Sequence, residues 1–115
     1  MVYQQTQCEA SDACEATHAD VAGAILLDVR REAAYRAAQF RLVGAQWKDP
    51  CTIESWVADL PTDREIIVYC VYGHEVSRSA AMRLRAAGLN ARYLCGGIDG
   101  WQAAALPVEP KEVSS

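Results

Sequence analysis

The stretch that decides the fold is IIVYCVYGHEVSRSAAMRLRAAG, which runs from Ile66 to Gly88. It begins with an apolar run, passes through a short polar segment that contains a glycine, and continues with strong helix formers. We therefore expect a buried strand that ends at Cys70, a loop, and a helix that Gly88 terminates. This order places the Cys70 thiol where loop amides and a helix N-terminus converge, which favours a thiolate.

Two other apolar runs are expected to form strands of the same kind. They are AILLDV, residues 24–29, and ARYLC, residues 91–95, which two glycines follow. REAAYRAAQF, residues 31–40, contains strong helix formers and lies between the first two strands. Strands that alternate with helices favour a mainly parallel sheet with helices on both faces, which is an α/β fold.

Two further segments are expected to be helical. DPCTIESWVADL, residues 49–60, has Asp49 as a candidate N-cap, Pro50 at the first helical position and apolar residues at helical spacing. The alanine-rich segment from Ser11 to Ala22 also favours a helix.

The carboxyl ends of the expected strands carry polar or sulfur-containing side chains. Asp28, Cys70 and Cys95 each lie at such an end. In parallel sheets, sites form beyond the carboxyl ends of the strands. We therefore expect these three distant parts of the chain to converge on one site.

Length and composition indicate one globular domain over residues 1–115, with a core from about residue 24 to 108 and a frayed tail from residue 109 to 115. Apolar residues make up 51% of the chain and charged residues 23%, as in ordinary packed domains. The net charge of −4 argues against nucleic acid and anionic membrane surfaces as partners, because both select concentrated Lys and Arg.

The cysteines and the N-terminal segment indicate a cytoplasmic protein. MVYQQTQCEASD has neither the basic nor the apolar region of a secretory signal, and no apolar run reaches membrane-spanning length. Five cysteines without a C-x-x-C motif do not suggest a disulfide framework, and two histidines offer little for a metal site. Cys8, Cys14 and Cys51 are expected to be structural or incidental.

Several pieces of the sequence, in this order and spacing, resemble a single-domain rhodanese, the sulfurtransferase module. These pieces are LLDVR (26–30), VGA (43–45), VYCVYG (68–73) and LRAAGLNARYLCGGIDGW (84–101). The resemblance implies an open fold around a central five-stranded parallel sheet, with Cys70 as the cysteine that carries sulfane sulfur. QFRLVGAQWKDP, residues 39–50, is also similar to rhodanese domains found near bacterial chromate-resistance genes.

The loop CVYGHEV, residues 70–76, departs from ordinary short-loop rhodaneses because it is one residue longer. Seven residues are typical of the related cell-cycle dual-specificity phosphatases and rhodanese-like arsenate reductases. Those relatives place an arginine six residues after the cysteine, where its planar fork grips an oxyanion. That position is Val76 here, and Arg78 is expected to lie already on the helix, so an oxyanion reductase or phosphatase is the weaker alternative.

The chemistry that the resemblance implies is transfer of sulfane sulfur from thiosulfate or a persulfide to a thiol or cyanide through a persulfide on Cys70. The partners are then a small sulfur donor and a thiol acceptor, which includes protein thiols, and no metal or organic cofactor is needed. Backbone N–H groups of the loop would cradle the sulfur. These groups belong to Val71, Tyr72, Gly73, His74, Glu75, Val76 and Ser77, and Gly73 suits a tightly curled loop.

Side chains around the loop leave alternatives open. Arg30 either meets an anionic donor or forms a surface ion pair with Glu32 or Asp28, and Asp28 is expected to hold loop amides rather than act as a base. His74 either hydrogen-bonds the donor and protonates a leaving group or is simply exposed. Glu75 opposes a dianion such as thiosulfate and favours a persulfide or another donor of low charge.

Ser77 and Ser79 either take part in the site, Ser77 as a helix cap and Ser79 as a second hydroxyl, or belong to solvated surface. Cys95 either resolves an oxidised Cys70 into a disulfide or is a small buried hydrophobe. A non-catalytic or redox-sensing binding module is therefore an alternative to the sulfurtransferase. A Cys70–Cys95 disulfide in a protein that forms no persulfide on Cys70 would favour this alternative.

Overall fold

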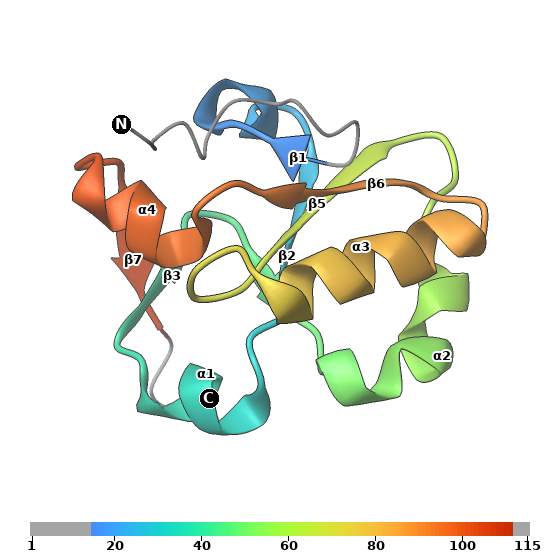
Figure 1. Ribbon diagram of the computed structural model, residues 1–115, viewed down its shortest axis with the longest axis horizontal. Coiled ribbons are helices and arrows are strands. Elements are labelled where there is room, and N and C mark those ends of the chain that lie inside the picture. The colour runs from blue at the N-terminus through green and yellow to red at the C-terminus, as the bar shows by residue number, and fades with distance from the viewer. Residues whose placement is uncertain (1–14, 112–115) are drawn as a thin grey trace, which may run out of the picture.

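Five parallel strands form the central sheet of the computed structural model, which describes residues 15–111 (Figure 1). Their spatial order is β1-β6-β5-β2-β4. The strands are β1 (Glu15–Ala16), β2 (Ile25–Asp28), β4 (Gln46–Trp47), β5 (Glu65–Tyr69) and β6 (Asn90–Leu94). The expected five-stranded parallel sheet is therefore confirmed, with β5 at its centre.

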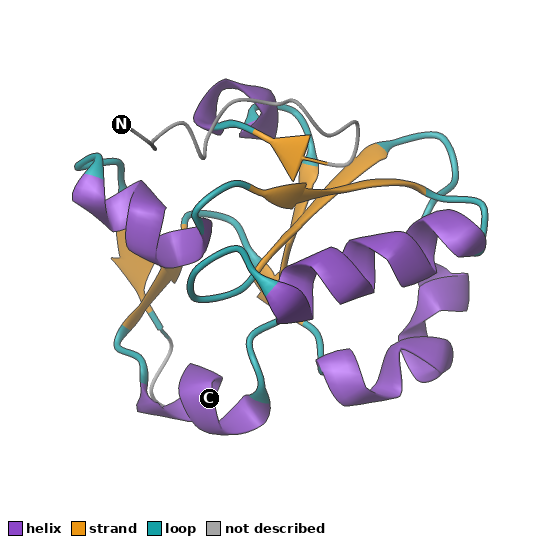
Figure 2. Ribbon diagram, viewed as in Figure 1, coloured by secondary structure: helices purple, strands orange, loops and turns teal. Residues whose placement is uncertain are grey.

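Helices cover both faces of this sheet (Figures 1 and 2), which confirms the expected α/β fold. Helices α2 (Ile53–Trp56) and α3 (Glu75–Ala86) pack on one face. The other face carries α4 (Gly97–Ala103) and the 3₁₀ helix η2 (His18–Val21). Within residues 15–111, no helix is long and apolar enough to cross a membrane.

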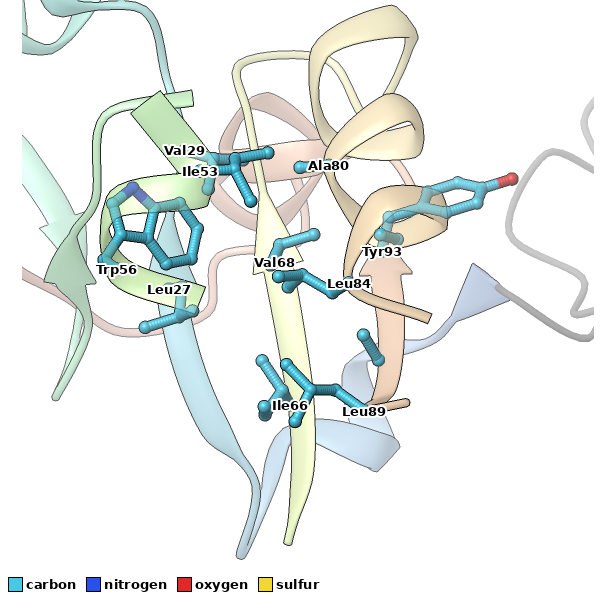
Figure 3. Packing of buried hydrophobic residues seen from close by; sticks show 12 residues of the cluster. Leu27, Val29, Ile53, Trp56, Ile66, Val68, Ala80, Leu84, Leu89 and Tyr93 are labelled. Atoms are coloured by element: carbon cyan, nitrogen blue, oxygen red, sulfur yellow. The ribbon is translucent and has the colours of Figure 1, made fainter. Parts of the chain in front are cut away.

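After Glu65, strand β5 consists of buried apolar or aromatic residues, because the sheet is covered on both sides. Ile66 and Val68 face the α2 and α3 side of the sheet, and Ile67 and Tyr69 face the α4 side. All four side chains are fully buried. Figure 3 shows Ile66 and Val68 packed with residues of the two covering helices, among them Trp56 and Leu84. A strand in this position has no solvated face, which explains a continuous apolar run rather than an alternating one.

The helix expected over residues 49–60 is broken into three short turns, so that prediction is wrong in its length. The turns are η3 (Pro50–Thr52), α2 (Ile53–Trp56) and η4 (Val57–Asp59). Asp49 is the N-cap as expected, and its side chain accepts from the Cys51 amide. The Asp49 carbonyl accepts from the Thr52 amide at 3.2 Å and from the Trp56 indole Nε1 at 2.9 Å.

The N-terminal helix expected from Ser11 to Ala22 is wrong for the residues that the structure describes. Glu15–Ala16 forms strand β1 beside β6, with Ala16 fully buried, and η2 follows as a single 3₁₀ turn. Residues 11–14 lie outside the described part of the chain. Pairing with β6 supplies hydrogen bonds and burial that alanine-rich local propensity does not reveal.

A small antiparallel ribbon lies beside the main sheet and was not expected. Helix α1 (Glu32–Ala37) ends before residue 40, and β3 (Phe40–Leu42) pairs with β7 (Val108–Pro110). Arg41 and Glu109 form an ion pair across the ribbon at 2.7 Å. The expected fraying from residue 109 is therefore wrong for Glu109 and Pro110, because cross-strand pairing holds them.

Candidate active site

The nucleophile candidate lies at a strand–loop–helix junction. Cys70 directly follows β5, and α3 begins at Glu75. The Arg78 amide donates to the His74 carbonyl at 3.0 Å, which is the first helical hydrogen bond, so Arg78 is on the helix as expected. Cys70 is therefore held between the carboxyl end of the central strand and the N-terminus of the longest described helix.

A hollow of about 280 Å³ opens over Cys70, and we call it the Cys70 hollow. Its lining comes from the loop, from the start of α3, and from the segment between β2 and α1 together with α1. The lining residues are Arg30, Arg31, Ala34, Cys70, Val71, Tyr72, His74, Glu75 and Val76. Seven of the expected site residues thus line this hollow. Arg31 also lines it, although the sequence did not indicate a role for Arg31.

Among residues 15–111, the Cys70 sulfur has one side-chain hydrogen-bond partner, which is Ser77. Cys70 Sγ and Ser77 Oγ lie 3.2 Å apart, and Ser77 is fully buried in the first turn of α3. His74, and not Ser77, occupies the N-cap position, and no side chain caps this helix by a hydrogen bond. The thiol donates to the hydroxyl, and the hydroxyl can turn to donate to a thiolate.

Asp28 and Arg30 form a buried ion pair at the wall of the Cys70 hollow, which Arg30 lines. The Arg30 Nη2 and Asp28 Oδ2 atoms lie 2.6 Å apart, and Nε lies 2.9 Å from Oδ1. Asp28 also accepts from the backbone amide of Arg30, so it does hold a loop amide. The pairing of Arg30 with Asp28 was one of the alternatives, but the pair is buried rather than at the surface.

Aromatic rings and a carbonyl fix the Arg30 guanidinium in place. Its carbon lies 5.6 Å from the centre of the Tyr35 ring and 5.7 Å from that of Tyr69, and Nη2 donates to the Phe40 carbonyl. Burial opposes the charged form, but the hydrogen bonds and charge of Asp28 outweigh it and raise the pKa of Arg30. Arg30 therefore presents a fixed positive charge whose Nε and Nη2 donors are already engaged.

Two glycines let the loop and the start of α4 interlock, and we call this contact the glycine clasp. A Cβ atom on Gly73 would lie 2.7 Å from the Gly96 nitrogen, and one on Gly97 would lie 2.4 Å from the Cys70 carbonyl oxygen. Gly73 and Gly97 have φ angles of 75° and 59°. Gly73 was expected for the loop's curl, whereas the role of Gly97 was missed although it follows a strand end at the same edge.

The start of α4 also orients the peptide groups of the loop. The amides of Ile98 and Asp99 donate to the carbonyls of Cys70 and Val71 at 2.9 and 2.8 Å. A trans peptide holds its N–H opposite its C=O, and the described chain has no cis peptide bond. The N–H groups of Val71 and Tyr72 therefore point away from α4.

The remaining expected site residues lie at the edge of the site or outside the Cys70 hollow. Tyr72 and His74 are exposed at its rim, with ring centres 6.2 Å apart. The Arg78 guanidinium lies 5.5 Å from the centre of the Tyr93 ring and does not line the hollow. Cys95 is buried at the end of β6, where its amide donates to the Ala16 carbonyl. Roles for Arg78 and Cys95 stay predictions.

The fold and site define an α/β protein with a candidate cysteine nucleophile between a parallel strand and a helix. The chain belongs to the rhodanese-like domain family, whose family model matches residues 9–104. This match confirms the resemblance seen in the sequence. No curated protein matches the chain.

Solved structures of similar proteins agree with this assignment. The rhodanese-like domain of a protein from Anabaena sp. is 30% identical, with a TM-score of 0.64, and the match covers 75% of this chain and 98% of that domain. Two others, 24% and 23% identical, show likeness in fold. A full-length protein from Lactobacillus plantarum has a TM-score of 0.76 over 86% of this chain and 89% of its own. A rhodanese-related protein from Thermoplasma volcanium has a TM-score of 0.72 over 83% and 96%.

Proposed function

We propose that the protein is a sulfurtransferase that moves sulfane sulfur from a donor to a thiol or cyanide acceptor through a persulfide on Cys70. The observation that carries the proposal is the buried Cys70 thiol, which lines the Cys70 hollow and lies 3.2 Å from the buried Ser77 hydroxyl. The N–H groups of Val71 and Tyr72 point away from α4 and are available to stabilise a charged sulfur.

The reaction has two balanced steps. The Cys70 thiolate attacks the outer sulfur of the donor, the donor's S–S bond breaks, and the remaining thiolate, or sulfite from thiosulfate, leaves with the bonding electrons. An acceptor thiolate then attacks the outer sulfur on Cys70 and takes it away as a persulfide, while cyanide takes it as thiocyanate. Cys70 returns as a thiolate, so no net oxidant is consumed. This cycle needs Cys70 reduced, which suits a reducing compartment such as the cytoplasm.

The alternatives have less support from the geometry. Val76 lines the Cys70 hollow where phosphatases and arsenate reductases of this type carry an arginine, and Arg78 lies against Tyr93 instead. A non-catalytic or redox-sensing module is favoured only by the Glu75 carboxylate at the rim. The physiological donor, a protein acceptor and a link to chromate-resistance genes are further predictions that rest on the same chemistry.

The proposal is tested by mass spectrometry of the protein after incubation with thiosulfate and, separately, with a small organic persulfide. We expect the wild type to gain one sulfur atom on the peptide that contains Cys70, and Cys70→Ser to gain none there. Cys51→Ser is the matched control, because it removes an exposed cysteine and should keep the gain. If no donor loads Cys70, the sulfurtransferase proposal fails, and a Cys70–Cys95 disulfide after mild oxidation would then favour redox sensing.

A second prediction concerns the Ser77 hydroxyl. Ser77→Ala removes the side-chain partner of the Cys70 sulfur, and a hydrogen bond to a charged group contributes about 1.5 kcal/mol or more. We therefore expect sulfur loading about tenfold slower in Ser77→Ala at neutral pH. Ser55→Ala, which removes an exposed hydroxyl on α2, should load at the wild-type rate. Equal rates for Ser77→Ala and wild type would remove Ser77 from the site.

A further inference from the structure

The Cys70 hollow shares a wall with a second hollow of about 170 Å³, which we call the Cys51 hollow. Arg31, Glu75 and Val76 line both spaces. Helix α1, the start of α3 and the segment that leads into α2 lie at the same end of the sheet (Figure 1). A small molecule that approaches the Cys70 sulfur from this side therefore meets Arg31 and Glu75.

The Arg31 side chain is available for a ligand. It is exposed, and among the arginines of residues 15–111 it is the one whose side chain has no hydrogen bond, ion pair or ring contact with another described residue. Three other arginines already form ion pairs: Arg30 with Asp28, Arg36 with Glu32, and Arg83 with Glu54. Arg31 therefore brings a positive charge to the rim without an ion pair to any described carboxylate.

Glu75 brings the opposite charge to the same rim. Its carboxylate is exposed at the first position of α3, and no described residue donates a hydrogen bond to its side chain. Arg31 and Glu75 also form no ion pair with each other in the described structure. A donor that carries only negative charge is attracted by Arg31 but repelled by Glu75, and a cation meets the reverse.

We propose that the rim formed by Arg31 and Glu75 selects a small zwitterionic donor, an α-amino acid persulfide, with Arg31 on its carboxylate and Glu75 on its ammonium group. This inference rests on the proposed function and names its substrate class. A volume of about 280 Å³ lies near the lower end of small-molecule pockets, which span about 300–1,000 Å³, so a small donor fits better than a large one.

The sulfur chemistry at Cys70 stays the same with this donor. The Cys70 thiolate attacks the outer sulfur of the amino acid persulfide, and the S–S bond of the donor breaks. The products are a Cys70 persulfide, which keeps the proton of the outer sulfur, and the amino acid thiolate. The charged groups of the donor remain at the rim throughout, so Arg31 and Glu75 determine specificity and take no part in bond making.

The test compares initial rates of sulfur loading on Cys70 with four donors. They are cysteine persulfide, N-acetylcysteine persulfide without the ammonium group, cysteine methyl ester persulfide without the carboxylate, and the neutral persulfide of 2-mercaptoethanol. A partly exposed charge contact contributes about 1 kcal/mol, so we expect the wild type to load cysteine persulfide about fivefold better than either blocked form at low donor concentration.

Each variant should lose the preference that depends on the charge it removes and keep the other preference. Glu75→Gln should load the cysteine and N-acetylcysteine persulfides at similar rates, and Arg31→Gln should do so for the cysteine and methyl ester forms. The neutral donor makes no charged contact at the rim, so the rate of each variant with the three cysteine derivatives is expressed relative to its own rate with the neutral donor. Arg36→Gln is the matched control, because Arg36 is an exposed α1 arginine that lines neither hollow.

The outcomes separate this inference from the proposed function. If all four donors load wild type and variants at the same rates, the selective rim is wrong while the sulfurtransferase stands. If thiosulfate loads Cys70 but none of the four persulfides does, the selective rim is wrong and the sulfurtransferase stands. If thiosulfate fails as well, the sulfurtransferase itself is wrong. A preference that is the same in both variants and in Arg36→Gln would also overturn the roles of Arg31 and Glu75.

Discussion

Replacing Gly97 with alanine is expected to destabilise the protein by about 2–5 kcal/mol and to remove most sulfur loading on Cys70. The new Cβ would lie 2.4 Å from the Cys70 carbonyl oxygen and 2.6 Å from that of Val71. Both oxygens belong to the backbone, so a side-chain rotation cannot relieve the clash. A left-handed backbone adds about 1–2 kcal/mol of strain for a residue with a side chain. The loop must therefore shift, and the Cys70 sulfur shifts with it.

Urea unfolding of Gly97→Ala beside Gly44→Ala separates the clash from the backbone strain. Gly44 also has a positive φ, of 82°, but a Cβ there would meet nothing within 4 Å. Gly44→Ala should lose about 1 kcal/mol and keep wild-type sulfur loading. If the two variants lose the same stability and load sulfur equally well, the close contact between the loop and α4 does not have the importance assigned to it.

Removing the charge of Asp28 is expected to have an effect of similar size. In Asp28→Asn the Arg30 guanidinium stays buried without its counter-charge, and breaking a buried ion pair in this way costs about 3–5 kcal/mol. The measurement is again the free energy of unfolding in urea. Glu32→Gln, which breaks the exposed pair with Arg36, serves as control and should cost less than about 1 kcal/mol.

A second variant tests whether the unpaired charge of the buried Arg30 guanidinium causes the loss of stability. Adding Arg30→Gln to Asp28→Asn removes the buried cation, so the double variant should regain part of the lost stability. If Asp28→Asn is as stable as the control, or if the double variant loses the two single effects added together, the ion pair does not stabilise the fold through its charges.

Segments whose fold depends on local signals could be predicted from the sequence. Strand β5 and helix α3 follow from a continuous apolar run, helix formers and the stop at Gly88. Strand β1 and the β3–β7 ribbon could not be found in this way, because each strand has two or three residues and forms through pairing with a distant segment. The break in residues 49–60 accompanies a hydrogen bond from the Trp56 indole to the Asp49 carbonyl, which periodicity does not show.

The candidate site was predictable where it is continuous in sequence. Cys70 and the loop after it stand at a strand–helix junction that the pattern reveals. Gly97 was missed because its importance arises where two segments far apart in the chain touch. Arg31 was missed because an exposed arginine beside another arginine carries no pattern, and its significance depends on which of the two is already paired.

The glycine clasp also sets the order in which the site can form during protein synthesis. A ribosome makes the chain from its N-terminus, so Cys70 and its loop are synthesised before Gly97, Ile98 and Asp99. A nascent chain that ends before residue 97 lacks the amides that hold the carbonyls of Cys70 and Val71. The conformation of the loop at Cys70 therefore depends on amides of helix α4, which are synthesised after the loop itself.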